Sequence, residues 1–123
     1  MEIAIIAHDG KKADIVQFLN KNKTILLRED IKIIATGTTG SKAESVGFKV
    51  KKMLSGPQGG DAQIAGRVAE GKTKMVLFFK DPLSSHAHES DVSMLVRVCD
   101  VQNVPLATNE ASAQLFLNAI AKE

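Results

Sequence analysis

Side chains that can do chemistry follow each of the five short apolar runs in this sequence. They are His8 and Asp9, Thr36 to Gly40, Ser55 to Asp61, Asp81 with His86, His88 and Asp91, and Thr108 with Asn109. Imidazole and carboxylate groups can take up or deliver protons, while hydroxyl groups and glycine-rich backbone can bind an anion. The pattern is typical of an active site built from loops at one edge of a sheet.

The segment Thr36–Gly40 (TGTTG) is the most specific local pattern. Its glycines allow a tight turn with inward-pointing N–H groups, its threonines add hydroxyl donors, and a helix is expected directly after it. That combination favours a site for the phosphate group of a small molecule, with Lys12 as a candidate cation. An ordinary turn with a threonine cap, and a solvated surface lysine, would give the same residues. The segment matches neither common nucleotide-binding motif, so a nucleotide is not indicated.

The Gly-rich stretch Ser55–Gly60 leads into Asp61, which has two interpretations. In the first, the stretch is a surface loop and Asp61 caps the helix that follows, a frequent role for aspartate. In the second, the two glycines before Asp61 let a ligand approach closely and the carboxylate serves as a general base. The stretch alone favours the cap.

A second polar cluster lies after the fourth apolar run, where His86 and His88 occur between Asp81 and Asp91. Two histidines among carboxylates raise the question of a metal site, but this segment is predicted to be a loop, and we expect no metal. A hydrogen-bonded structural role and a catalytic role both fit His88. Cys99 lies in an apolar helical pattern and is expected to be a buried small hydrophobe.

Composition excludes several functional classes. The 123 residues carry a net charge of +2, with five Phe, no Trp and no Tyr, so there is neither a strong field for a polyanion nor a set of rings to stack on bases. No nucleic-acid partner is expected. One cysteine permits no intrachain disulfide. The apolar runs are far shorter than the roughly 18 residues of a membrane span, and we expect a cytoplasmic protein with no membrane partner.

Short apolar runs alternate with amphipathic ones, which predicts alternating strands and helices. The predicted strands are Glu2–Ala7, Ile31–Ala35, Phe48–Leu54, Lys74–Phe79 and Val104–Ala107. The predicted helices are Lys11–Lys21, Ser41–Val46, Ala62–Glu70, Asp91–Gln102 and Glu110–Ala121, the last capped by Asn109.

This alternation predicts an α/β fold: a single three-layer domain over residues 1–123 with a largely parallel, five-stranded, flavodoxin-like sheet. In such sheets ligands bind beyond the carboxyl ends of the strands, where all the polar clusters fall.

Taken together, the motifs resemble those of the methylglyoxal synthase family. The residues that carry the resemblance are His8-Asp9 with Lys12, Thr36 to Gly40, Ser55-Gly56-Pro57 through Asp61, Asp81-Pro82-Leu83, His88 with Asp91, and Ala107-Thr108-Asn109. Each is short, but they occur in the family's order across nearly the whole chain. The resemblance implies a methylglyoxal synthase-like fold and an enzyme, a carbon–oxygen lyase, that converts dihydroxyacetone phosphate to methylglyoxal and inorganic phosphate without a cofactor.

The resemblance also implies roles for individual residues. Asp61 would abstract a proton from the substrate and His88 would polarise its carbonyl. The catalytic set implied is Asp61, His88, Asp91, His8 and Asp81, and the substrate-binding set is His8, Lys12, Thr36, Gly37, Thr38, Thr39, Ser55, Gly56 and His88. Phosphate, as product, is also a candidate inhibitor, and the family implies a homohexamer. Many members continue after the last helix into a basic tail, which residues 1–123 do not include.

Two other functional classes have a similar sheet. A non-catalytic, allosteric module of the same fold would keep a phosphate site without the acid–base residues, so Asp61, His88 and Asp91 favour the enzyme. A phospho-acceptor receiver domain would need an acidic pair after the first strand and a lysine after the last. This sequence has His8-Asp9 and Thr108-Asn109 there, and the receiver domain is rejected.

Overall fold

The computed structural model describes residues 1–84 and 89–123, with the backbone alone for residues 89–91. Its strands are β1 (Glu2–Ala7), β2 (Lys32–Ala35), β3 (Val50–Lys52), β4 (Thr73–Phe79) and β5 (Leu106–Ala107). Its helices are α1 (Lys12–Lys21), α2 (Lys23–Leu26), α3 (Gly37–Ser45), α4 (Gly60–Ala69), α5 (Glu89–Gln102) and α6 (Glu110–Ala121), with short 3-10 turns η1 (Asp9–Lys11) and η2 (Gly56–Gln58). In this part of the chain, no helix is both long and apolar enough to span a bilayer.

The strands form one five-stranded sheet in the order β3-β2-β1-β4-β5, and every neighbouring pair is parallel. The predicted α/β fold is therefore confirmed. The order is that of the first five strands of a doubly wound dinucleotide-binding sheet rather than flavodoxin's 2-1-3-4-5 order. It places β1 at the centre, paired on one side with β2 and on the other with β4.

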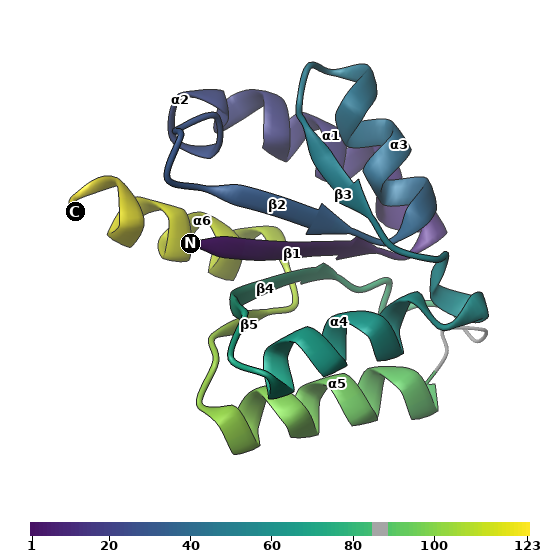
Figure 1. The fold of residues 1–123 in the computed structure, drawn as a ribbon. Coiled ribbons are helices and arrows are strands. Elements are labelled where there is room, and N and C mark those ends of the chain that lie inside the picture. Colours follow the sequence, from purple (N-terminus) through teal and green to yellow (C-terminus); the bar gives the residue numbers. More distant parts are fainter. Residues whose placement is uncertain (85–88) are drawn as a thin grey trace.

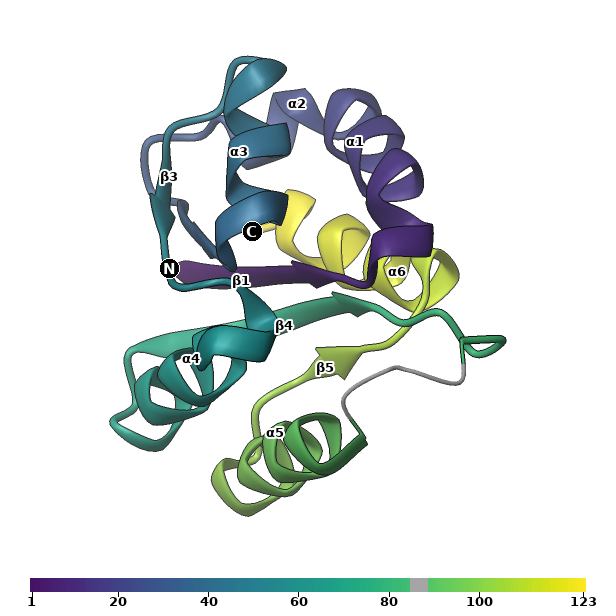
Figure 2. The same cartoon turned by 90° about the vertical axis from the view of Figure 1, so that its right-hand side faces the viewer.

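Successive residues of β1 point to opposite faces of the sheet, and helices cover both faces (Figures 1 and 2). Ile3 and Ile5 belong to the core that α1, α2, α3 and α6 cover. Ala4 and Ile6 belong to the second core, covered by α4 and α5. Each fully buried isoleucine contributes about 1.5–3 kcal/mol, which explains the nearly continuous apolar composition of β1.

Three element boundaries differ from the prediction for a physical reason. The helix α3 begins at Gly37 rather than Ser41, so the TGTTG segment is the first turn of a helix and not a separate turn. Thr36 is extended and its carbonyl accepts the N–H of Gly40 at 2.7 Å. The edge strands β3 and β5 are shorter than predicted because their ladders cover only three residues of β2 and two of β4.

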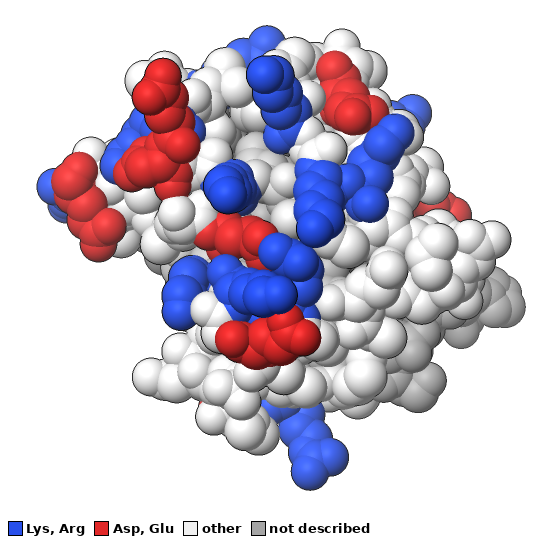
Figure 3. All heavy atoms as spheres, viewed as in Figure 1, with Lys and Arg blue, Asp and Glu red and all other residues white. Residues whose placement is uncertain are grey.

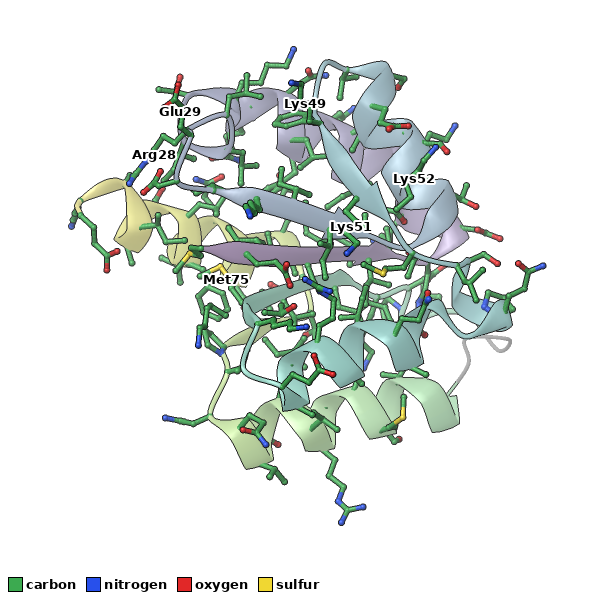
Figure 4. The ribbon with its side chains drawn as sticks, viewed as in Figure 1. Arg28, Glu29, Lys49, Lys51, Lys52 and Met75 are labelled. Carbon is green, nitrogen blue, oxygen red and sulfur yellow. The ribbon has the colours of Figure 1, made fainter. Side chains whose placement is uncertain are left out.

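The edge strand β3 carries Lys51 and Lys52, both exposed, just after the exposed Lys49 (Figure 4). Lys52 pairs with Glu44 at 3.0 Å. Lysines on an edge strand hinder pairing with another sheet, because association would desolvate their charges. On the face seen in Figure 3, blue and red side chains are interspersed, so the lysines of β3 do not form part of a broad single-sign surface there.

Glu2 joins the amino-terminal ends of the two central strands to α4. Arg67 donates from Nε and Nη2 to its two carboxylate oxygens at 2.9 and 2.7 Å, and Thr73 Oγ1 donates to Oε2 at 2.6 Å. The Glu2 side chain is only 11% exposed. The hydrogen bonds from Arg67 hold the pKa of Glu2 below its ordinary value of 4.5.

Glu2→Gln is expected to lower the free energy of unfolding at neutral pH by about 1–2 kcal/mol, because the amide cannot accept both Arg67 bonds. Since folding lowers the pKa of Glu2, its contribution is complete above about pH 4.5 and is lost as the pH falls through the folded-state pKa. Urea unfolding of both proteins over this pH range should therefore show their stabilities converging in acid. Glu70→Gln, which breaks the exposed pair with Lys72, is the matched control and should change stability little. A constant difference between wild type and Glu2→Gln down to acid pH would contradict this account.

Candidate active site

The strands β1 and β4 lie side by side, but the chain leaves them toward opposite faces of the sheet. After β1 it enters α1 on one face, and after β4 it continues to α5 on the other (Figure 2). A crevice opens at such a switch point, at the carboxyl ends of the strands. A cavity of about 190 Å³ lies there, and its lining includes His8, Asp9, Gly10, Lys12, Thr36, Thr38, Ser55, Gly56, Pro57, Asp61, Asp81 and Ser84.

His8 follows the last residue of β1, and backbone groups hold its position. Its N–H donates to the carbonyl of Phe79 at 3.1 Å, and its ring stands edge-on to Phe78 with the ring centres 5.0 Å apart. The backbone N–H of Asp81 donates to His8 Nδ1 at 2.8 Å. Because Nδ1 acts as the acceptor, the neutral imidazole carries its proton on Nε2.

The Asp81 carboxylate is also oriented by backbone. Its Oδ1 accepts the N–H of Leu83 at 3.0 Å. A Cβ added to Gly10 would collide with the Asp81 carboxylate, so the loop after β1 approaches this group closely. No role was predicted for Gly10, since a single glycine in a loop carries little signal.

Lys12 is the first residue of α1, and its ammonium group is partly buried in the wall of the cavity. It donates to the carbonyl of Ala7 at 2.8 Å and to Thr39 Oγ1 at 2.9 Å. Burial lowers the pKa of Lys12, and the nearby carboxylates of Asp9 and Asp61 oppose that shift. A lysine so held has a fixed position in the wall of the cavity and is not a solvated surface lysine.

The first turn of α3 forms the wall opposite α4. Thr36 is 3% exposed and its side chain reaches the cavity, as does that of Thr38. The N–H of Gly37 donates to the Leu54 carbonyl at 3.2 Å, which ties this turn to the segment before Ser55. The amino terminus of a helix favours an anion because its N–H groups point outward and its dipole is positive there.

Asp61 is the second residue of α4 and lines the cavity while only 3% exposed. Its predicted role as the helix cap is wrong, because the N-cap of α4 is Gly59, which has a φ of +107°. A Cβ on Gly56 would lie 3.4 Å from Asp61 Oδ1, so the backbone of η2 packs closely against this carboxylate. The structure thus places a buried carboxylate in the wall of the same cavity as Lys12, close enough for its charge to act on the ammonium group.

Not every predicted site residue can be placed in the cavity. His86 and His88 lie outside the described residues, and Asp91 belongs to α5 but its side chain is not described. Gly37 and Thr39 belong to the first turn of α3 but are not part of the described lining.

Several lining residues were absent from the predicted set. No role was predicted for Asp9, and its place in the lining follows from its adjacency to His8. Pro57 and Ser84 carried no signal that would have assigned them. Among the described residues, no three His, Cys, Asp or Glu side chains gather closely enough to hold a metal ion.

Known proteins resemble this chain over most of its length. The family model described as "MGS-like domain" matches residues 14–108. A methylglyoxal synthase of Clostridium botulinum is 52% identical over 118 residues, covering 95% of this chain and 98% of the relative. A methylglyoxal synthase of Carboxydothermus hydrogenoformans is 50% identical over 121 residues and 98% of both chains.

Among solved structures, the crystal structure of methylglyoxal synthase from Elizabethkingia anophelis superimposes with a TM-score of 0.86 at 41% identity. It covers 94% of this chain and 76% of that one. Since the match spans 98% of the Clostridium and Carboxydothermus relatives, neither has room for a long basic tail. The basic tail that the resemblance implies for other members is therefore not shared by these two relatives.

Gly60 lies close to the segment before Ser55, and this contact can be used to test whether that part of the cavity wall contributes to binding. A Cβ at Gly60 would collide with the backbone carbonyl of Leu54, so Gly60→Ala must displace the chain that carries Ser55 and Gly56. We expect lower stability and weaker binding of inorganic phosphate, measured by urea unfolding and calorimetric titration.

Gly66→Ala in the same helix is the matched control. Among the described residues, no atom lies within 4 Å of a Cβ built there, so this change should stabilise α4 by up to about 1 kcal/mol. It should leave phosphate binding unchanged. If Gly60→Ala and Gly66→Ala change phosphate binding equally, the segment that carries Ser55 and Gly56 is not part of the phosphate site.

Proposed function

Since the chain belongs to the methylglyoxal synthase family of enzymes, we propose that it converts dihydroxyacetone phosphate to methylglyoxal and inorganic phosphate. The observation that carries the proposal is that one cavity is lined by a buried carboxylate, Asp61, by the ammonium-bearing Lys12 and by the first turn of α3. This arrangement supports a base beside a phosphate site, as the reaction requires.

The phosphate group would bind where positive charge and N–H donors converge. Two of the three ammonium hydrogens of Lys12 are directed to Ala7 and Thr39, which leaves the third for a phosphate oxygen. The hydroxyls of Thr36, Thr38 and Ser55 would add hydrogen bonds, and the backbone of Thr39 and Gly56 would supply N–H groups at the first turns of α3 and η2.

Asp61 would remove a proton from the hydroxymethyl carbon next to the ketone. A carboxylate that is 3% exposed keeps little of its hydration, which favours its action as a base once substrate fills the cavity. The electrons of the broken C–H bond move toward the carbonyl oxygen and give an enediolate. His8, with its proton on Nε2, would donate a hydrogen bond to that developing charge.

The enediolate would then collapse with cleavage of the carbon–oxygen bond to phosphate. Inorganic phosphate leaves with the bonding electrons, and the remaining enol takes up a proton to become methylglyoxal. By family resemblance His88 would also polarise the carbonyl, while Asp81 and Asp91 would adjust the protonation of the groups around it.

The direct test is to incubate the purified, metal-chelated protein with dihydroxyacetone phosphate and to follow methylglyoxal and phosphate together. Release of both in equal amounts is the expected result. A folded protein that binds inorganic phosphate but gives no product would instead be a non-catalytic binding module of the same fold.

Asp61→Asn should keep the fold and lower kcat by about 100-fold or more, because the amide has nearly the same shape but cannot accept the proton. Circular dichroism and a steady-state assay check the two parts of this prediction. Asp100→Asn, an exposed position on α5, is the matched control and should retain full turnover. Turnover near that of wild type in folded Asp61→Asn would assign the base to another group.

The family resemblance also implies a homohexamer and inhibition by the phosphate product. Light scattering coupled to gel filtration measures the first. Initial rates at increasing phosphate concentration measure the second, with sigmoidal dependence indicating that binding at one site affects another.

A further inference from the structure

Phe78, the sixth residue of β4, contacts the imidazole of His8 inside the cavity. It is part of the cavity lining although it is only 1% exposed, and the centre of its ring lies 5.0 Å from that of the imidazole. The two rings meet at 79°, so that the edge of one faces the plane of the other. Aromatic pairs favour this arrangement, which defines the tilt of one ring against the other.

The contact follows from the register of β1 on β4. Ile6 pairs with Phe78, and both side chains belong to the core that α4 and α5 cover. His8 is extended, with φ −64° and ψ 157°, so the alternation of β1 continues and the imidazole points to the same face as Ile6. Diagonal neighbours on adjacent strands lie within reach of aromatic side chains. The central ladder therefore places His8 against the ring of Phe78.

We propose that Phe78 is a positioning residue for the reaction: it fixes the plane of the His8 imidazole and thereby directs the Nε2–H group toward the carbonyl oxygen of the substrate. Phe78 acts through His8 and does not take part in proton transfer itself. The inference deepens the proposed function and rests on it, because the oxygen is the one that becomes negative in the enediolate.

The physical reason is that one hydrogen bond does not fix an imidazole. The backbone N–H of Asp81 holds only the Nδ1 atom, at 2.8 Å. The torsion that turns the ring has broad minima, so the ring could still tilt about the bonded atom. Such a tilt would swing Nε2 away from its acceptor, and a hydrogen bond weakens steeply as its angle departs from linear. Contact with Phe78, a side chain packed in the core, restricts this tilt.

The direction of the Nε2–H group matters because charge develops on the carbonyl oxygen only as the reaction proceeds. A donor that already points to this oxygen does not have to reorient when the charge appears. Three groups from one segment hold His8: the ring of Phe78, the carbonyl of Phe79 and the N–H of Asp81. The imidazole is therefore oriented by the end of β4 and the residue that follows it.

The test compares Phe78→Leu with wild type in the dihydroxyacetone phosphate assay. Leucine keeps an apolar side chain in the core but has no ring to restrict the imidazole. We expect kcat to fall about 10-fold, less than the roughly 100-fold that complete loss of such a donor costs, because His8 is still present. KM and the affinity for inorganic phosphate should change little, since the phosphate group would bind to other residues of the cavity.

Phe18→Leu is the matched control. Phe18 is 0% exposed, and its ring also makes an edge contact with another ring, that of Phe79, with the centres 5.3 Å apart. It belongs to the core on the opposite face of the sheet. Both substitutions remove a buried ring and should lower the midpoint of urea unfolding by similar amounts. Only Phe78→Leu should lower kcat.

Nitrogen NMR of the imidazole separates positioning from a loss of core packing. Because Nδ1 accepts the Asp81 N–H, neutral His8 should show one nitrogen without a proton and one with a proton. In Phe78→Leu the looser ring admits the other tautomer, so the two signals should move toward each other. Phe18→Leu should keep the wild-type signals. The sequence has three histidines, and the signals of His8 are those that disappear in His8→Gln.

The inference is overturned if folded Phe78→Leu has the wild-type kcat, or if its kcat falls while the nitrogen signals of His8 stay where they are. An equal fall of kcat in Phe18→Leu would also overturn it. Failure of the proposed function has a different signature. In that case wild type releases no methylglyoxal, while the nitrogen signals still show whether Phe78 holds the imidazole.

Discussion

The whole arrangement depends on the parallel pairing of β1 with β4. Six residues of β1 pair with β4, from Glu2 opposite Thr73 to Ala7 opposite Phe79, and this ladder lies at the centre of the sheet. The two strands point the same way, but their following helices cover opposite faces. No helix can then fill the space above their carboxyl ends, so His8 and Asp81 meet there at a crevice. The cavity is therefore a direct result of the strand order, which sends the chain to opposite faces of the sheet after β1 and after β4.

The site gathers opposite charges on short helical turns. Lys12 begins α1, Asp61 is in the first turn of α4, and the first turn of α3 supplies Thr36 and Thr38. Helix starts hold these groups on rigid elements instead of on long loops, so little ordering is needed when a ligand binds. Burial of Asp61 and partial burial of Lys12 strengthen the attraction between their opposite charges, because little water screens them.

The fold followed from the sequence because periodicity and strand-end chemistry are local signals. The core of β1 and β4 was evident from continuous apolar runs, and Asn109 was recognised as a cap that does accept the Ser112 N–H. The start of α3 was misplaced, since glycine and threonine have low helix propensity and the tertiary hydrogen bond from Gly37 to Leu54 overrides it.

The composition of the cavity was harder to foresee. His8, Lys12 and Asp61 were recognised by residue type, but Gly10 and Ser84 line the cavity only because of how distant loops approach. The bond from Lys12 to Thr39 depends on the side-by-side position of α1 and α3, which no local pattern encodes.

The bond that orients His8 has its donor on the main chain of residue 81. A side chain at this position can therefore change over evolutionary time without altering the tautomer of the histidine, provided that it is not proline, which has no N–H. The backbone at residue 81 orients the His8 imidazole, and the side chain at this position can change without affecting that orientation. The backbone N–H and the side chain of residue 81 can thus be subject to separate selection.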